Sequence, residues 1–321
     1  MWYLKLRMYL LLTILFGILY AIATVIGQTI GISNFYFYFI LSLFFMFIQY
    51  MIGPKIIEWS MRIRYVNENE APELHKIVED LANKAGIPKP KIGISYINIP
   101  NAFAFGKGIS DGRVCVTEGI LRLLNKNELR AVLGHEISHI KNRDVLVISL
   151  LSVIPFVLYR IAWHFMWYGG YRRRERGSLN TALIGFIAFL FYFITNLLVL
   201  YASRIREYFA DRGSIELGNQ PSWLASSLYK LVYGSARVDK DLLKEAEGFK
   251  AFFLNDPSRA QNEIFELEQL DLDRSGTIDN YELEELKNRK IKLSFGDKLF
   301  ELLSTHPNML KRIKQLSEYS V

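Results

Sequence analysis

The chain contains four long apolar runs, which alternate in pairs with polar segments. No charged residue occurs at positions 8–54, and a polar, turn-prone stretch at 27–34 splits this block in two. Each half is about 20 residues long, enough for a helix to cross the ~30 Å hydrocarbon core of a bilayer. The first half is too long for the core of a signal peptide and no cleavage site follows it. Residues 1–57 therefore predict a transmembrane hairpin.

A second pair of apolar runs follows at residues 145–203. The run at 179–203 is free of charge and long enough to span a bilayer. In the run at 145–167, Arg160 and His164 interrupt the apolar sequence after about 15 residues, a length that also suits a core helix. The later run predicts a membrane helix, whereas for the earlier run both interpretations stay open.

Basic residues at the ends of the runs predict the orientation, because cytoplasmic segments of membrane proteins are enriched in Lys and Arg. Two basic residues precede the first run, and Lys55, Arg62 and Arg64 follow the second, while the connection between these runs is uncharged. The N-terminus and the chain after the second run are thus expected in the cytoplasm. The basic connection at 171–178 contradicts this rule if the second pair spans fully, and agrees with it if the pair only dips into the membrane. Both arrangements return the flanking segments to the same side.

The polar segments predict a catalytic domain that the second apolar pair divides in two. Hydrophobic residues recur at helical spacing within 71–88. Three short β-prone segments, at 91–99, 101–106 and 113–117, predict a small sheet. We expect Asn127 to cap the helix that follows and runs through the sequence HEISH.

Composition and charge narrow the functional classes. The hydrophobic content of 51% and the mean hydropathy of +0.13 suit a membrane protein. The formal charge of +7 gathers at the ends of the apolar runs, where Lys and Arg anchor helices and meet anionic lipid, so we expect no nucleic-acid partner. A single cysteine, Cys115, excludes an intrachain disulfide and fits a reducing compartment. Its β-prone setting predicts an inert, buried thiol.

The sequence HEISH contains the residue types of a hydrolytic metal site. His135 and His139 lie four residues apart, so they share one face of a helix and can reach one ion. Zinc in hydrolases commonly takes three protein ligands and leaves the fourth position to water, from which Glu136 can take a proton. Glu207 and Asp211, again four apart, are candidates for the third ligand: one can bind the ion while the other orients an imidazole. In the alternative interpretation these two acids form surface ion pairs.

Further motifs accompany the two metal-site segments. The metal-site segments are HEISHIKNRD and SRIREYFAD, with the second apolar pair between them. Four other motifs occur in the same chain, namely PNAFAFG, VTEGILRLLNKNELRAVLGHE, LASSLYKLV and STHPNMLKRI. In type and order, and over nearly the whole chain, these motifs resemble the HtpX family of membrane zinc metalloproteases, relatives of the CAAX prenyl endopeptidases. The resemblance implies a gluzincin-like domain with one zinc per chain. The implied zinc ligands are His135, His139 and Glu207, with Glu136 as the general base and Asp211 behind the ligands.

The resemblance also implies contacts to the substrate. One short segment would pair with the substrate backbone as an added strand, which gives weak side-chain specificity. This segment consists of Asn101, Ala102, Phe103 and Ala104. His306 and Arg312 would lie near the zinc, where a hydrogen-bond donor stabilises the oxyanion of the reaction. The alternative role for His306 is to cap the helix that follows it.

One insertion departs from the resemblance, and its residues 271–282 have the pattern of a calcium-binding loop. Oxygen-bearing residues fall at loop positions 1, 3, 5, 7, 9 and 12, with Gly276 at position 6 and Ile278 at position 8. The expected ligands are Asp271, Asp273, Ser275, the Thr277 carbonyl, Asp279 and Glu282. The alternative is an acidic, solvated loop. Bound calcium would either modulate activity, by ordering the segment that leads to His306, or only stabilise the fold.

The predicted organisation alternates membrane and catalytic segments. The segments are the N-terminal transmembrane hairpin (1–57), the first half of the catalytic domain (58–144), the second hydrophobic hairpin (145–203), the second half of the catalytic domain (204–257), the calcium-binding insertion (258–292) and the C-terminal catalytic segment (293–321). We therefore expect an α+β membrane protein, mostly α-helical, whose transmembrane helices accompany a metalloprotease domain with a small sheet.

The function predicted from these features is that of a zinc endopeptidase for misfolded or short-lived membrane proteins. We expect a multi-pass protein of the cell membrane whose active site faces the cytoplasm, with zinc and calcium as cofactors. A CAAX-type maturation protease for lipidated proteins is an alternative, although four apolar runs are few for that class. A catalytically silent, calcium-responsive scaffold is another, which the intact Glu136 argues against. The natural substrate and the oligomeric state are not predicted.

Overall fold

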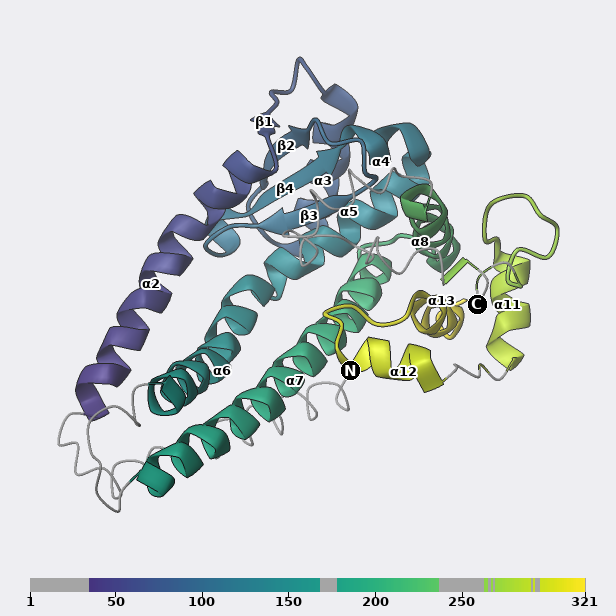
Figure 1. Ribbon diagram of the computed structural model, residues 1–321. Helices are drawn as coiled ribbons and strands as arrows, with labels where there is room; N and C mark the ends of the chain where they lie inside the picture. Colours follow the sequence, from purple (N-terminus) through teal and green to yellow (C-terminus); the bar gives the residue numbers. More distant parts are fainter. Residues whose placement is uncertain are drawn as a thin grey trace. The chain divides into compact units, whose positions relative to one another are not determined.

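The structure, a computed structural model, describes most of the chain (Figure 1). The described residues are 35–167, 178–236, 263–264, 267, 269–289, 291 and 295–320. The chain divides into an apolar unit, within Met1–Ile52 and Leu146–Ile205, and a polar unit, within Gly53–Val145 and Arg206–Val321. The first predicted apolar run, the basic connection at 171–177 and residues 237–262 of the predicted catalytic and calcium-binding segments lie outside the described residues.

Three helices carry the remaining apolar runs. The second run lies in α2 (Phe35–Ser60), the third in α6 (Asp144–Trp167) and the fourth in α7 (Ser178–Glu216). Within the described residues one helical stretch, Leu183–Glu216, is long and apolar enough to cross a membrane, with a mean hydropathy of 2.4. The multi-span arrangement stays a prediction.

A four-stranded sheet belongs to the polar unit. Its strands are β1 (Ile63–Tyr65), β2 (Lys91–Ser95), β3 (Ala102–Phe105) and β4 (Arg113–Thr117), in the spatial order β1-β2-β4-β3. β2 and β4 are parallel, and the two outer strands pair with them antiparallel. The predicted small sheet is therefore confirmed, and β1 is an additional strand. Cys115 in β4 is fully buried, as predicted, and burial raises the pKa of its thiol above the usual range.

Helices make up the rest of the polar unit. Those among the described residues are α3 (Pro72–Ala85), α4 (Glu118–Leu123), α5 (Lys126–Lys141), α8 (Pro221–Ala236), α11 (Asn280–Asn288), α12 (Phe295–Leu302) and α13 (Met309–Ser317). The helix predicted within 71–88 is α3, which ends where Gly86 adopts a φ of 70°, a conformation that favours glycine. The α5 helix packs against α3, α8 and β3, so the HEISH segment lies at the centre of this unit (Figure 1).

The start of α5 differs from the prediction, because its cap is Asn125 and not Asn127. The Asn125 side chain accepts hydrogen bonds from the backbone N–H groups of Asn127 and Glu128. In return the Glu128 carboxylate accepts a hydrogen bond from the Asn125 backbone N–H, at 2.9 Å. This reciprocal capping box requires a glutamate or glutamine three residues after the cap, and Asn127 has Arg130 at that distance.

Two glycines allow α5 and α7 to approach each other closely. A methyl group on Gly134 would lie 2.4 Å from Nδ2 of Asn219. A methyl group on Gly213 would lie 2.3 Å from Oγ and 2.7 Å from Cβ of Ser138. Because these distances are shorter than real contacts of a methyl group, only glycine fits at these positions without a shift of the neighbouring atoms. The close approach brings the end of α7 against the face of α5 that carries the histidines.

Candidate metal centre

Helices α5 and α7 bring the three predicted zinc ligands together. The Nε2 atoms of His135 and His139 lie 3.1 Å apart, as expected for residues on one helix face. Glu207 of α7 lies beside both: its Oε2 is 3.6 Å from Nε2 of His135, and its Oε1 is 3.5 Å from Nε2 of His139. His135 and Glu207 are 1% and 5% exposed. Three possible ligand atoms thus surround one small, buried space.

The distances fit a divalent ion such as zinc. Zinc binds nitrogen and carboxylate oxygen at ~2.0–2.2 Å in a tetrahedral arrangement, which sets neighbouring ligand atoms about 3.3–3.5 Å apart. Oε2 of Glu207 is buried, and Nδ1 of His306 and Nη1 of Arg312 lie 3.3 and 3.2 Å from it. Because Nδ1 of each histidine faces a carboxylate, the proton of each neutral ring belongs there, and both Nε2 lone pairs face the shared space. A cation in that space would satisfy all three side chains.

A buried aspartate lies behind each histidine. Oδ1 of Asp211 is 2.8 Å from Nδ1 of His135, and Oδ2 of Asp144 is 2.5 Å from Nδ1 of His139. The sequence predicts Asp211 at such a position, but Asp144 is missing from the predicted site. The signal that could have identified it is an acidic residue in the first turn of the helix that follows HEISH.

Two buried arginines hold these aspartates. Arg312 of α13 donates from Nε and Nη2 to the two oxygens of Asp211, at 2.9 and 2.6 Å, and its Nη1 is 3.2 Å from Oε2 of Glu207. Arg206 of α7 donates from Nε and Nη2 to Oδ1 of Asp144. The structure therefore brings the predicted Arg312 to the site, where it contacts carboxylates. Arg206 is a second arginine that the sequence does not single out.

Glu136 lies next to the ligands and is only 4% exposed. A group of possible ligand atoms within 4.8 Å of one another includes one from each of His135, Glu136 and His139. The backbone N–H of Ala104 hydrogen-bonds to the Glu136 carboxylate. Burial raises the pKa of this carboxyl above its ordinary value, which makes the carboxylate a stronger base.

The predicted substrate strand is the edge strand β3. Asn101 and Thr117 are paired by a backbone hydrogen bond of 2.9 Å, so by alternation Phe103 and Phe105 are the residues that exchange hydrogen bonds with β4. The backbone groups of Ala102 and Ala104 consequently point away from the sheet. The bond from Ala104 to Glu136 agrees with this direction. Backbone groups of an edge strand therefore reach the candidate metal centre.

His306, on the segment before α13, also reaches this centre. Its Nδ1 lies 3.3 Å from Oε2 of Glu207, and its Nε2 has no hydrogen-bond partner among the described residues. The alternative interpretation, a helix cap, is wrong, because the cap of α13 is Asn308, whose side chain accepts a hydrogen bond from the Leu310 N–H.

The predicted calcium loop gathers three carboxylates. Oxygen atoms of Asp271, Asp273 and Glu282 lie within 4.8 Å of one another, and Gly276 has a φ of 78°. Of the other predicted ligands, Asp279 caps α11 by accepting a hydrogen bond from the Glu282 N–H. The hydroxyl groups of Ser275 and Thr277 hydrogen-bond to each other, at 2.8 Å. The structure therefore brings three of the four predicted carboxylate ligands into one group.

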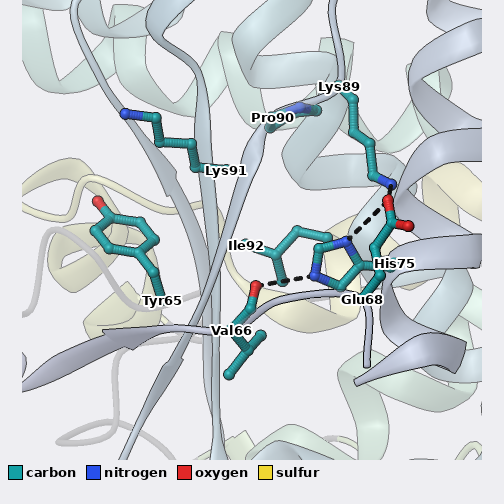
Figure 2. Close-up of a pocket in the computed structure, with 8 residues that line it drawn as sticks. All are labelled: Tyr65, Val66, Glu68, His75, Lys89, Pro90, Lys91 and Ile92. Carbon is teal, nitrogen blue, oxygen red and sulfur yellow. Dashed lines mark hydrogen bonds and ion pairs between the residues drawn. The ribbon is translucent and has the colours of Figure 1, made fainter. Parts of the chain in front are cut away.

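A cavity of about 290 Å³ lies elsewhere in the polar unit (Figure 2). In it, His75 contacts the Val66 carbonyl oxygen through Nε2, at 3.0 Å, and Lys89 pairs with Glu68 at 2.7 Å. Tyr65 and Lys91 line the wall drawn opposite these residues in Figure 2. None of the predicted ligands lines this cavity, so it is separate from the candidate metal centre.

Comparisons with known proteins identify the family of the chain. Residues 68–320 match the family described as "Peptidase family M48". The chain is 52% identical over 231 residues to "Protease HtpX homolog" of Methanothermobacter thermautotrophicus, covering 72% of this chain and 86% of the relative. It is 40% identical over 223 residues to "Protease HtpX homolog" of Moorella thermoacetica, covering 68% and 74%.

One solved structure is similar at lower identity. The crystal structure of S. mikatae Ste24p matches with a TM-score of 0.47 and 18% identity, covering 97% of this chain and 65% of that chain. This likeness is too remote to transfer residue roles. The family match and the HtpX homologues, which cover more than two thirds of this chain, show that the chain belongs to peptidase family M48 and is a metalloprotease of the HtpX type.

Proposed function

We propose that this metalloprotease is a membrane-anchored zinc endopeptidase that cleaves misfolded or short-lived membrane proteins at the cytoplasmic face of the cell membrane. The observation that carries the proposal is the convergence of His135, His139 and Glu207 around one buried space, with Glu136 beside them. In the sequence, these ligands flank the second apolar pair at 145–203. A site whose ligands adjoin membrane helices on both sides suits substrates that are themselves at the membrane.

Exposed apolar side chains support the membrane location. Along α7, Leu183, Phe186 and Phe193 are 56%, 61% and 48% exposed, although all are large and apolar. Exposed apolar surface of this kind marks contact with lipid or with another protein. Near the end of α2, Trp59 is 84% exposed, and tryptophan is enriched where membrane helices meet water.

The proposed chemistry divides the work among this chain's own residues. A zinc ion held by His135, His139 and Glu207 would supply a Lewis acid and hydroxide at neutral pH. Glu136 accepts the proton of the attacking water and returns it to the leaving amine, the two proton transfers that a general base and acid perform.

The remaining groups bind the substrate and stabilise developing charge. The outward backbone groups of Ala102 and the carbonyl group of Ala104 pair with an extended peptide, while the Ala104 N–H, which hydrogen-bonds to Glu136, keeps the scissile bond beside this carboxylate. A protonated nitrogen of His306 donates to the oxyanion that forms on the peptide carbonyl. Arg312 contacts only carboxylates in the bonds described above, so we assign it to positioning Asp211 and Glu207 instead.

The test is cleavage of an unfolded reporter protein by the detergent-purified full chain. Glu136→Gln should lower the cleavage rate by about 10²- to 10⁴-fold, the contribution of a general base, while bound zinc stays at one ion per chain. Glu118→Gln, at a half-exposed site on α4, is the matched control and should cleave normally. Wild-type cleavage by Glu136→Gln would refute the proposed mechanism. Cleavage confined to lipidated C-terminal peptides would favour the CAAX-type alternative.

We also propose that residues 271–282 bind calcium and that the bound ion stabilises the metal centre from a distance. Asp271 and Glu282 are buried, and Tyr229 of α8 donates to Asp271 at 2.9 Å, which ties the loop to the helical core. Glu282 lies in the first turn of α11. At the other end of α11, Nζ of Lys314 donates to two carbonyl oxygens at 2.6 Å each. Lys314 and Arg312 share α13, so ordering of α11 supports the arginine that holds Asp211.

Calcium dependence can be separated from zinc dependence. With zinc held constant, calcium should raise the melting temperature and the peptidase rate relative to a calcium-selective chelator. Glu282→Gln, which removes the charge at loop position 12, should abolish both effects. A rise in melting temperature without a change in rate would reduce the role of calcium to stabilisation. Equal melting temperatures and rates in both conditions would refute calcium binding.

A further inference from the structure

We propose that Asp144 and Arg206 form a positioning pair that fixes His139 as a metal ligand. The proposal rests on the metal site proposed above and adds two residues to it. Both residues lie outside the HEISH segment, and Asp144 and Arg206 are 62 positions apart in the sequence.

The contacts of Asp144 link the two residues to the ligand. One carboxylate oxygen, Oδ2, lies 2.5 Å from Nδ1 of His139. The other, Oδ1, accepts hydrogen bonds from Nε and Nη2 of Arg206. Nη2 of Arg206 also donates to the backbone carbonyl oxygen of Asn142, at 2.9 Å. Each oxygen of Asp144 therefore has its own partner, and the arginine is held at two points.

The second histidine has the same arrangement. Asp211 places one oxygen 2.8 Å from Nδ1 of His135 and receives two hydrogen bonds from Arg312. Each imidazole thus has an aspartate behind it, and a buried arginine holds each aspartate. Two independent copies of one arrangement around one space indicate a shared task, namely to orient the two rings.

The physical reason for the arginine is the cost of burying a carboxylate. Asp144 is 6% exposed, and a carboxylate in such a place is costly to bury unless hydrogen-bond donors and a cation lie beside it. The two hydrogen bonds from Arg206 offset this cost and fix the direction of the carboxylate. The fixed carboxylate faces Nδ1 of His139, which orients the ring with Nε2 toward the shared space.

Asp144 also has a purely structural explanation, which the test must separate from this role. It is the first residue of α6, where a negative charge stabilises the helix through the helix dipole. Its bond to Arg206 joins the residues immediately before and after the second apolar pair. Loss of either residue could therefore destabilise the fold without any effect on the ligand, so a measurement specific to the metal is needed.

The experiment compares zinc affinity, by competition with a chromophoric chelator, and the visible spectrum of the cobalt-substituted full chain. Arg206→Gln and Asp144→Asn should each weaken zinc binding by about 10- to 100-fold, as loss of outer-shell partners does, and should shift the cobalt bands. Arg206→Lys should restore the affinity only in part, because a lysine makes a single-point contact. Arg212→Gln, which breaks a more exposed pair with Glu216 on the same helix, is the matched control.

The outcomes distinguish the positioning pair from the metal site itself. If His139→Ala loses zinc while Asp144→Asn and Arg206→Gln bind zinc and cobalt as the wild type does, the site stands and the positioning pair is refuted. A lower melting temperature of the metal-free variants, with unchanged affinity and spectrum, would likewise assign the pair to the fold alone. If His135→Ala and His139→Ala both retain zinc, the proposed metal site fails.

Discussion

Glu207 is the residue on which three histidines converge. His135 and His139 approach its two oxygens through Nε2, and Nδ1 of His306 lies 3.3 Å from Oε2. The first two rings each have an aspartate behind Nδ1, whereas Nδ1 of His306 faces Glu207 itself and its Nε2 has no hydrogen-bond partner among the described residues. A ring in that state can turn its donor toward a substrate, which is the role proposed for it.

At the residue scale we predict that His306→Ala lowers kcat by about 10²- to 10³-fold, the usual loss when one oxyanion donor is removed. Zinc content and melting temperature should change little, because His306 is not among the three proposed ligands. The measurement is steady-state cleavage of a peptide reporter together with metal analysis. His75→Gln is the matched control, since His75 lines the other cavity (Figure 2). A rate within twofold of the wild type would show that His306 has no part in the reaction.

Two pairs of site residues could be predicted from the sequence. In each pair the residues are four positions apart, and this spacing alone places them on one face of a helix. His135 with His139, and Glu207 with Asp211, are such pairs, and the structure brings all four together. Asp144 and Arg206 could not be predicted in this way. Their contact depends on where two distant helices lie, and charged residues are common enough that spacing does not identify a partner.

Among the secondary-structure elements, the crossing of α5 and α7 decides whether a site can form at all. Gly134 and Gly213 permit the two helices to approach until Glu207 reaches the histidines. A wider crossing would leave the carboxylate too far away to share an ion with both imidazoles.

At the element scale we predict that Gly213→Ala destabilises the polar unit. The new methyl group would lie 2.7 Å from Cβ of Ser138, an atom fixed to the backbone of α5. Overpacking costs about 1–3 kcal/mol, whereas alanine gains at most ~1 kcal/mol in helix propensity over glycine. The net effect should be a lower melting temperature and weaker zinc binding.

Gly53→Ala is the matched control for this crossing. Gly53 lies in a helix, α2, and a methyl group there would meet no atom within 4 Å. This variant should be as stable as the wild type or slightly more stable. If Gly213→Ala were also as stable as the wild type, the close crossing would not be a requirement of the site.

The elements were predictable where local sequence decides them. The α3 helix has a regular apolar stripe and ends at Gly86, and the β-prone segments form strands. The cap of α5 was misplaced by two residues, because two asparagines compete and the partner Glu128 decides between them. The strand β1 was missed, since three residues, two of them polar or charged, carry too little pattern. The edge position of β3 follows from strand order, which no local pattern contains.

For the whole molecule, the second apolar pair separates the second proposed zinc ligand from the third in the sequence. The chain enters α6 five residues after His139, and the third proposed ligand, Glu207, lies in α7 four residues after the apolar run that ends at Ser203. The proposed ligands therefore lie next to both ends of the second apolar pair. If α6 and α7 enter lipid, the active site must lie near the membrane surface.

At this scale we predict that the catalytic segments lie in the cytoplasm. The only cysteine, Cys115, is fully buried, so the wild-type protein, without an added cysteine, should react little with maleimides. A membrane-impermeant maleimide should label Ser33→Cys, in the uncharged connection of the first hairpin, in intact cells. It should label Asn69→Cys, at an exposed position of the polar unit, only after lysis. The opposite pattern would reverse the proposed orientation.

The sequence by itself determined the family, the residue types of the candidate metal centre and the alternation of apolar and polar segments. These features are local, because helical spacing, residue chemistry and hydrophobic run length are each contained in a few consecutive positions. Only the tertiary structure decided which side chains stand behind the histidines, which strand has a free edge at Glu136, and what holds His306 near Glu207. Those facts depend on contacts between residues far apart in the chain, such as Arg312 with Asp211 and Arg206 with Asp144. Such contacts form only when the packing of whole helices brings them together.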